Sequence, residues 1–468
     1  MAARVQSTGW LPALLAVPIF ILVGLLAGID PKLGVLAAVG IVFVLVALTD
    51  LAAALVVLII VVFAESTPLA GPALSATKIA GLLLLLGWIA RLATQQSGRE
   101  TVIFTVHPGF SYLLALFLSW IALSLVWAEN VSLALDQASV FLLVAILYVI
   151  VFTAIRTRRQ AIWVIGAFVL GTAIMAAYGL VLRPDPNGQA ADRLASTIQD
   201  PNYLAAFLVA GVALGGAAFV AARGHRWLQL GALTSVALCL AAFVLTGSRG
   251  GIIGLAVALI VAIAFAGRWR ARIAVSALVV TICAVGYYTI YAPADLTQRI
   301  ASASEGELDQ RDTRLTIWTV AWRMAKDNPL HGVGIGNFPV ESINYVLEPG
   351  TTFRTDRVID NPPVAHNSYL GPLAELGIVG VSMFIAILGF SFVCAVRAAQ
   401  RFARNDDLRM EALARGLVVA LAGVLTAGIF ISAESNKVLW LLLAMGPALL
   451  AVADSAERMP RSRPRPVI

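Results

Sequence analysis

The sequence predicts an all-α polytopic membrane protein, and its composition carries the prediction. Hydrophobic residues make up 60% of the 468 positions, charged residues make up only 13%, and the mean hydropathy is +0.89. Soluble domains carry about a quarter charged residues, so much of this apolar surface must face lipid as well as neighbouring helices. Since no internal repeat or low-complexity linker divides the chain, we expect a single transmembrane domain over residues 1–468.

The spanning segments follow from the apolar runs, because a helix needs about 20 apolar residues to cross a bilayer. Fourteen candidate runs are present, at residues 10–29, 33–48, 51–64, 78–93, 109–128, 132–154, 161–182, 202–222, 228–246, 251–266, 273–292, 377–396, 412–431 and 437–453. The second and third runs are short and meet at Thr49 and Asp50. Merging or re-entry there would leave twelve or thirteen spans. The first run lacks an Ala-x-Ala-like cleavage site, which favours an uncleaved span over a signal peptide.

The orientation follows from the basic residues on alternate sides of the spans. With the N-terminus inside, the inner segments hold 20 Lys and Arg, and the short outer loops hold only 6, namely Lys32, Lys78, Arg183, Arg193, Arg249 and Lys437. Cytoplasmic loops carry the excess, so both termini are predicted to be cytoplasmic, with residues 454–468 as a basic tail. The net charge of +7 is then a feature of topology, and a nucleic-acid partner is not expected.

The interval 293–366 is then an extracytoplasmic loop with structure of its own. Thr313 to Lys326 places four apolar residues at helical spacing, Leu315, Trp318, Trp322 and Ala325. We expect an amphipathic helix there, capped by Asp312 or Thr313 and lying on the bundle or at the headgroup level, where tryptophans commonly anchor. The sequence HGVGIGNF at 331–338 does not follow a strand and departs from the dinucleotide-binding pattern. It predicts a tight turn with closely packed backbone.

The segment after this loop is too long for one span. Ser368 to Val396 has 29 residues, about 43 Å of helix, against a hydrocarbon core of about 30 Å. Pro372 and Gly377 indicate a break. We therefore expect a short outer helix at 368–376, capped by Asn367 or Ser368, followed by the span proper at 377–396.

Polar groups collect at three outer boundaries. Arg193 and Asn202 precede the eighth run, Arg249 lies in LTGSRGGIIG before the tenth, and His366 ends the long loop. Arginine has a planar fork that suits phosphate, and the glycines beside Arg249 would let a large anion approach the backbone. The alternatives are that each arginine snorkels to the headgroups and that His366 is a satisfied structural group. Two convergent arginines favour a diphosphate ligand.

No metal site or cofactor is predicted. The four histidines show no i,i+4 pairing, and neither HExxH nor a GxSxG elbow occurs. The three cysteines, Cys239, Cys283 and Cys394, lie inside apolar runs, which leaves no disulfide framework for the outer loop.

Three motifs in this order resemble the O-antigen ligase and O-antigen polymerase superfamily of the bacterial envelope. They are SRGG after a span, RLTIWTVAWRMAKDNPLHGVGIGNF in the long loop, and HNSYLGPLAELGIVG after it. The resemblance covers roughly Arg193 to Gly380. Near Arg193 the sequence RLASTIQDPN keeps the Pro-Asn pair but has Ala195 where the family commonly has glycine.

The resemblance implies a GT-C-like glycosyltransferase of the inner membrane with its active site facing the periplasm. Such an enzyme transfers a glycan from an undecaprenyl-diphosphate donor to a glycan or glycolipid acceptor, without metal or nucleotide sugar, as in lipopolysaccharide biosynthesis. The functional residues carried over are Arg193, Arg249 and His366.

Our mechanistic hypothesis assigns Arg193 and Arg249 to the diphosphate and His366 to the acceptor hydroxyl as general base, with inversion at the anomeric carbon. Further substrate-binding candidates are Arg314, Asn367, Glu375, Trp318 and Trp322. A polysaccharide polymerase of the same superfamily is the close alternative. A polysaccharide transporter or flippase is the alternative outside it, although transporters tend to place ionisable groups at mid-membrane and to show repeated halves.

Overall fold

The computed structural model of the chain describes residues 21, 23–64, 76–94, 103–182, 194, 196, 200–265, 267–272, 274–275, 313–350, 358–359 and 364–458. Within these ranges the chain is almost entirely helical and has no β-strand, which confirms the all-α fold class. Most of the predicted runs at 10–29 and 273–292 falls outside the described residues.

Every other predicted run coincides with a helix. These helices are α2 (Pro31–Thr49), α3 (Leu51–Ala64), α4 (Ala76–Thr94), α6 (Pro108–Ser124), α7 (Val131–Ala154), α8 (Arg158–Leu182), α9 (Pro201–Ala221), α10 (Arg226–Thr246), α11 (Arg249–Phe265), α16 (Leu370–Arg404), α17 (Leu408–Ala427) and α18 (Lys437–Arg458). Short elements lie between them, namely α5 (Ile103–Val106), η2 (Gly267–Trp269), α14 (Phe338–Val346) and η3 (Gly428–Phe430).

The second and third predicted runs form separate helices. Asp50 lies between them, and its carboxylate accepts hydrogen bonds from the backbone N–H groups of Ala52 and Ala53 at 3.0 and 3.2 Å. This is the action of a helix N-cap, which satisfies amide groups that have no partner within the first turn. The two runs therefore do not merge.

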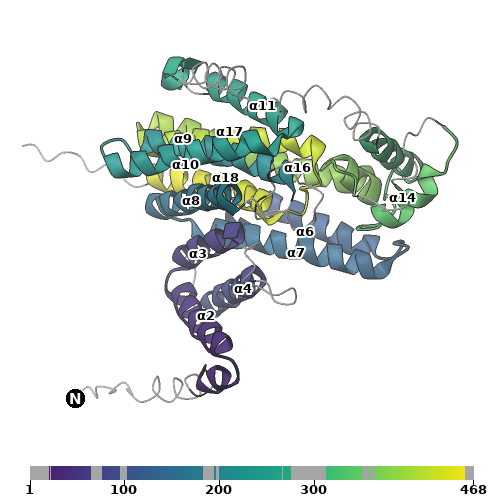
Figure 1. The fold of residues 1–468 in the computed structure, drawn as a ribbon, viewed down its shortest axis with the longest axis horizontal. Coiled ribbons are helices and arrows are strands. Elements are labelled where there is room, and N and C mark those ends of the chain that lie inside the picture. Colours follow the sequence, from purple (N-terminus) through teal and green to yellow (C-terminus); the bar gives the residue numbers. More distant parts are fainter. Residues whose placement is uncertain are drawn as a thin grey trace, which may run out of the picture.

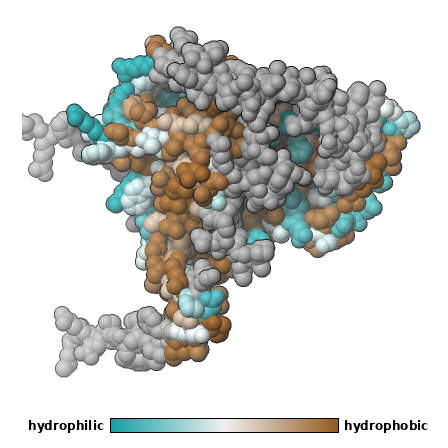
Figure 2. All heavy atoms as spheres, viewed as in Figure 1, coloured by the Kyte–Doolittle hydropathy of each residue, from teal (hydrophilic) through white to brown (hydrophobic). Residues whose placement is uncertain are grey.

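The protein is a multi-pass membrane protein. Among the described residues, seven helices are long and apolar enough to span a bilayer: α7, α8, α9, α10, α16, α17 continued into η3, and α18. Shorter apolar helices lie within α2, α3, α6 and α11. Figure 2 shows apolar side chains across the middle of the bundle and hydrophilic ones toward its two ends.

The centre of the bundle is held by close helix contacts. α9 packs against α17, α10, α8 and α11 (Figure 1). Glycine allows the approach of α17, because a Cβ atom at Gly416 would lie 2.3 Å from Ala217, and one at Gly423 would lie 2.5 Å from Val209. Small residues are common at helix interfaces in membranes. Lipid is as apolar as the side chains, so helix association there depends on close packing and not on the hydrophobic effect.

α16 is interrupted where the sequence indicates a break. Its 35 residues include Gly377, whose φ of 65° and ψ of −169° are not helical. The outer helix begins at Leu370, and the inner part continues beyond the predicted end at residue 396 to Arg404. Asn367 caps the outer helix, since its side-chain oxygen accepts from the N–H groups of Tyr369 and Leu370, both at 2.9 Å. Both the predicted break and the predicted cap are confirmed.

The membrane orientation can be tested by labelling. In a chain whose native cysteines are replaced, a single cysteine at Arg226 or Arg404 should resist a membrane-impermeant thiol reagent in intact cells. A cysteine at Leu347, which is 64% exposed in the loop after α14, should react. Labelling of the first two with protection of the third would reverse the predicted orientation.

Candidate functional site

The outer loop has a small hydrophobic core of its own. A helix over residues 313–327 turns Ile317, Val320, Ala321 and Met324 inward, where they pack with Phe338 and Val346 of α14. The predicted helix is confirmed, but its packed face differs from the expected stripe. Leu315 and Trp322 are 39% and 55% exposed. Ala325 of the expected stripe is buried and Trp318 packs against the cluster, but the contact with α14 centres the packed face on Ile317, Val320, Ala321 and Met324.

Arg323 joins this helix to the end of α14. Its guanidinium donates to the backbone carbonyls of Tyr345, Glu348 and Pro349 at 2.9, 3.2 and 3.3 Å, and it lies 3.7 Å from the Glu348 carboxylate. Carbonyls at a helix C-terminus lack partners within the helix, and a cation there satisfies them. Residues 313–350 of the loop therefore form a packed structure and not a slack connector.

The sequence HGVGIGNF forms the predicted tight turn. Gly332, Gly334 and Gly336 all have left-handed φ angles, of 68°, 99° and 70°. A Cβ atom at Gly332 would lie 2.3 Å from the carbonyl carbon of Glu375, and one at Gly334 would lie 2.8 Å from Cα of Ala128. The glycines thus let this turn lie backbone to backbone against α16 and the segment before α7.

The turn docks on the break in α16. Carbonyls that lose their helical partners at Gly377 accept from outside: that of Ala374 from the N–H of Val333 and that of Glu375 from the N–H of Gly334, both at 2.9 Å. The indole N–H of Trp120 donates to the carbonyl of Leu376 at 3.0 Å. The Glu375 side chain accepts from the backbone N–H groups of Gly336 and Phe338. The hydrogen bonds of the Glu375 side chain are therefore with this turn.

His366 precedes α16 in a strained conformation. Its φ of 48° is left-handed, which costs a residue other than glycine of order 1 kcal/mol or more and is typical of functional sites. Ser368 holds the segment in place: its N–H donates to the carbonyl of Gly428 at 2.8 Å, and its hydroxyl donates to that of Ile431 at 2.7 Å. The histidine is thereby fixed beside the link between α17 and α18.

Four charged or titratable groups meet near His366. Burial lowers the pKa of His366, the positive charge of Arg314 lowers it further, and Asp200 opposes both. Burial also lowers the pKa of Arg314, on which Asp200 and Arg249 act with opposite signs. The four side chains come from four elements: the start of α9, the start of α11, the first turn of helix 313–327 and the segment before α16.

The SRGG motif holds Arg249 at the N-terminus of α11. The Ser248 hydroxyl accepts from the N–H of Gly251 at 3.1 Å as a helix cap and lies 2.9 Å from the side-chain oxygen of Asn202, to which it donates. A Cβ atom at Gly250 would lie 2.7 Å from Phe430, so this glycine serves helix packing. The expectation that the neighbouring glycines open the backbone to an anion is therefore wrong for Gly250 and Gly251, which are both buried.

Arg193 lies outside the described residues. Its neighbour Leu194 is described, and its N–H donates to the carbonyl of Leu245 near the end of α10 at 3.0 Å. Two residues later the chain reaches Gly247, the left-handed cap of α10, and then Arg249. The residue next to Arg193 is thus held close to the start of the SRGG motif.

Of the remaining predicted side chains, Trp318 packs near Phe430 with ring centroids 6.2 Å apart, and Trp322 is exposed. Asn367 is buried and its oxygen serves the helix cap. The substrate-binding roles assigned to Asn367, Glu375, Trp318 and Trp322 stay predictions.

Sequence reasoning missed two acidic residues. Asp200 caps α9, accepting from the N–H of Asn202 at 2.6 Å, and Asp-Pro before an apolar run is a recognisable helix start. Glu434 lies between η3 and α18 with its Oε2 buried and, among the described residues, without a hydrogen-bond partner. Burial raises the pKa of Glu434 to about 8, and the nearby Glu375 carboxyl adds to this rise. A single acid in a short outer loop gave no sequence signal.

Residues 234–385 match the O-antigen ligase family. This match supports membership of the chain in the O-antigen ligase superfamily. The matched segment runs from the middle of α10 through the outer loop and His366 into α16, so it contains Arg249, Arg314 and His366. Comparison with curated protein sequences gives no match.

The matched O-antigen ligase segment, together with the apolar helices, supports a membrane protein that processes glycans by glycosyl transfer, with lipid-linked glycans as the general kind of substrate. In the part of the chain that the structure describes, no three His, Cys, Asp or Glu side chains gather as metal ligands. Metal independence stays a prediction.

Glu434 should make stability depend on pH. Its pKa is raised from 4.5 to about 8, so its favourable contribution is complete below pH 4.5 and is lost as pH rises through 8. Replacement of Glu434 by Gln removes this loss. The melting temperature of Glu434→Gln relative to the parent should therefore rise between pH 5 and pH 8.5, whereas the exposed Asp136→Asn variant should show no such trend. A constant difference across this range would contradict the burial of an ionisable carboxyl.

Proposed function

We propose that this O-antigen ligase family member transfers a glycan from an undecaprenyl-diphosphate carrier to an acceptor hydroxyl at the outer face of the bacterial cytoplasmic membrane. The observation that carries the proposal is the convergence of His366, Arg314, Arg249 and Asp200 from four elements of the fold. This set combines a neutral base with cationic groups for an anionic leaving group.

In the proposed donor site, Arg249 and Arg193 hold the diphosphate. Arg249 is exposed at the N-terminus of α11, where the helix dipole adds positive potential for an anion. Arg314 adds a second cationic group beside it. One guanidinium group can donate two parallel hydrogen bonds to two phosphate oxygens. It therefore orients the diphosphate as well as attracting it.

In the proposed reaction, the acceptor hydroxyl oxygen attacks the anomeric carbon of the donor glycan. The new C–O bond forms as the bond from that carbon to the diphosphate oxygen breaks, and its electron pair leaves with the lipid diphosphate. The arginines stabilise this charge in a preorganised site. His366 takes the hydroxyl proton, and attack opposite the leaving group inverts the anomeric centre. The proposal includes no metal and no nucleotide sugar.

The lowered pKa of His366 supports its role as base. Burial and the charge of Arg314 both disfavour the imidazolium, so the side chain is neutral near pH 7 and able to accept a proton. Asp200 opposes this effect and would stabilise the imidazolium once the proton has moved. Arg314 thus favours the neutral base before proton transfer, and Asp200 favours the protonated form after it.

For the remaining residues we propose two kinds of role. Trp322 is exposed on the loop and offers a surface on which a sugar ring can stack, while Trp318 shapes the site through Phe430. Asn367 and Glu375 act as positioning residues, because Asn367 caps the helix that follows His366 and Glu375 holds the glycine turn against that helix. A ligase and a polymerase differ in the acceptor, and the same chemistry serves both.

The first test separates bidentate hydrogen bonding from charge at Arg249. Arg249→Lys keeps the charge but loses the planar fork, and loss of one transition-state contact costs about 10²–10³ in rate. Transfer should fall by that order in an assay with purified enzyme and defined donor and acceptor. Arg226→Lys, at an exposed position at the other end of the bundle, should transfer normally. Unchanged turnover by Arg249→Lys would make Arg249 a snorkelling anchor.

The second test separates donor binding from transfer. His366→Ala should bind the lipid-linked donor with the affinity of the parent but lose nearly all transfer, because the histidine serves the acceptor. His225→Ala is the matched control, since that exposed histidine precedes α10 at the opposite end. Loss of donor binding by His366→Ala, or turnover at the parent rate, would contradict the assignment of His366 as the general base.

The third test uses the sign of the electrostatic effects on His366. Activity should rise with pH through the pKa of the imidazole, since the neutral form is required. Arg314→Gln removes a charge that lowers this pKa, so the midpoint should move to higher pH. Asp200→Asn removes a charge that raises it and can keep the helix cap through its amide oxygen, so the midpoint should move to lower pH. Shifts in the same direction would exclude His366 as the titrating group.

A further inference from the structure

A polar cavity lies at the end of the bundle opposite to the proposed glycosyl-transfer site. α7 has 24 residues, so its ends are about 36 Å apart. Its N-terminal end contacts the glycine turn through Asn130 and Asn337, and its C-terminal end, at Thr153 and Ala154, lines this cavity. In the orientation predicted above, this is the cytoplasmic end.

The cavity is formed where five helices meet. Its walls are the junction of α2 and α3, the end of α4, the end of α7 and the start of α8, and its volume is about 200 Å³. One water molecule occupies about 30 Å³ in the liquid, so the cavity has room for a tetrahedral oxyanion with part of the group that carries it. Its lining residues are Thr49, Asp50, Leu51, Ala52, Trp88, Arg91, Thr153, Ala154, Arg156 and Gln160.

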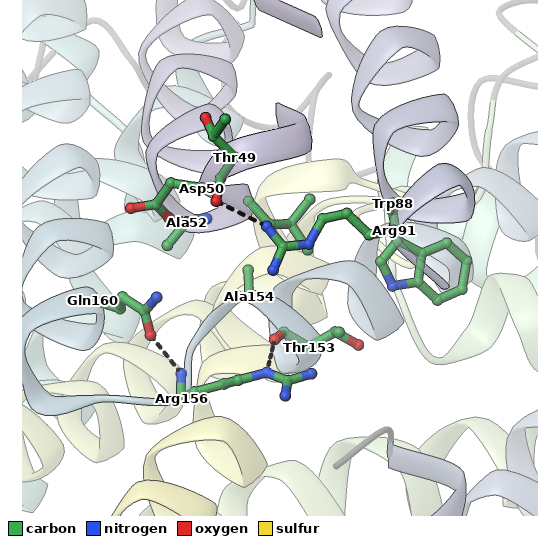
Figure 3. Close-up of a pocket in the computed structure, with 10 residues that line it drawn as sticks. Thr49, Asp50, Ala52, Trp88, Arg91, Thr153, Ala154, Arg156 and Gln160 are labelled. Atoms are coloured by element: carbon green, nitrogen blue, oxygen red, sulfur yellow. Dashed lines mark hydrogen bonds between the residues drawn. The ribbon is translucent and has the colours of Figure 1, made fainter. Parts of the chain in front are cut away.

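Two guanidinium groups face this cavity from different walls. Figure 3 shows Arg91 reaching it from α4 and Arg156 from the link between α7 and α8, on opposite sides of Ala154. Arg91 donates to the carbonyl of Thr49 at 3.1 Å, and Arg156 donates through Nε to that of Thr153 at 2.9 Å. Each arginine is therefore held in place by the C-terminal end of a helix.

Two acceptor oxygens of the lining, Oδ1 of Asp50 and Oε1 of Gln160, are engaged by the protein itself. The Asp50 carboxylate receives the N–H groups of Ala52 and Ala53, and the Gln160 side-chain oxygen receives those of Arg156 and Thr157. Donors dominate the rest of the lining. They include the indole N–H of Trp88, which is buried and has no hydrogen-bond partner among the described residues. A ligand that complements this lining must be rich in acceptor oxygens.

The charge of the lining narrows the choice of ligand. Arg91 and Arg156 against Asp50 leave a formal charge of about +1, which matches a phosphodiester. Beside the cavity, α2 and α4 expose apolar side chains that suit acyl chains, with Leu48 41% and Ile89 48% exposed. We propose that this cavity binds a phosphate group, carried by an anionic lipid of the adjacent leaflet. This site is independent of the glycosyl-transfer proposal.

The experiment titrates the purified full-length protein with three probes and follows its melting temperature. The probes are phosphatidylglycerol, phosphatidylcholine and inorganic phosphate. Phosphatidylglycerol should raise the melting temperature and zwitterionic phosphatidylcholine should not. Inorganic phosphate that reproduces the shift, with the same dependence on the two arginines, would support the site with a soluble ligand as its source.

Substitutions assign any binding to the cavity. Arg91→Gln and Arg156→Gln should each weaken phosphatidylglycerol binding about ten-fold or more, because each removes a charge-assisted contact. Arg91→Lys and Arg156→Lys keep the charge at the helix ends and should still weaken binding several-fold through loss of the fork. These lysine variants also test the proposal if the glutamine variants do not fold. Arg159→Gln is the matched control, since Arg159 is exposed nearby over the ring of Trp163 and does not line the cavity.

Two outcomes would overturn the proposal. One is the absence of any effect from both phosphatidylglycerol and inorganic phosphate. The other is binding that changes equally in Arg156→Gln and Arg159→Gln, which would show attraction to the basic surface as a whole.

Discussion

The break in α16 at Gly377 is the feature on which the half of the molecule that contains His366 depends. An interrupted helix leaves carbonyls without partners, and inside a membrane protein such groups must be satisfied by other protein groups. Here the glycine turn at 331–338 and Trp120 supply the donors, and the N–H of Ile378 beyond the break donates to the carbonyl of Pro329 at 2.8 Å. Exchange of backbone hydrogen bonds thus fixes a long loop on a membrane helix.

This docking explains why so many glycines occur in the turn. Side chains at Gly332 or Gly377 would separate the two backbones, because a Cβ atom at either position would lie 2.3 Å from a carbonyl carbon of the other segment. Once the turn is docked, helix 313–327 and the segment containing His366 are held on the same side of the bundle. In the proposed transfer this docking would keep the base within hydrogen-bond reach of its proton.

The electrostatics of the outer site depend on the same arrangement. Arg314, on the loop helix, acts on His366 together with Asp200 at the start of α9, and Arg249 at the start of α11 acts on Arg314. A partly buried cation lowers the pKa of a neighbouring histidine much more than a solvated one, since low polarity reduces screening. The fold therefore sets the protonation state of His366 through residues far from it in sequence.

The sequence by itself determined the helical membrane class, most helix bounds, the break at Gly377, the Asn367 cap and the tight glycine turn, because each depends on local hydropathy or backbone chemistry. It also indicated Arg249 and His366, since a charge or a histidine at a membrane boundary is conspicuous. Only the tertiary structure decided which face of helix 313–327 is packed, that Glu375 holds the glycine turn, and that Asp200 and Glu434 border the site. These features depend on contacts between residues distant in the chain, and hydropathy and spacing describe only neighbours along it.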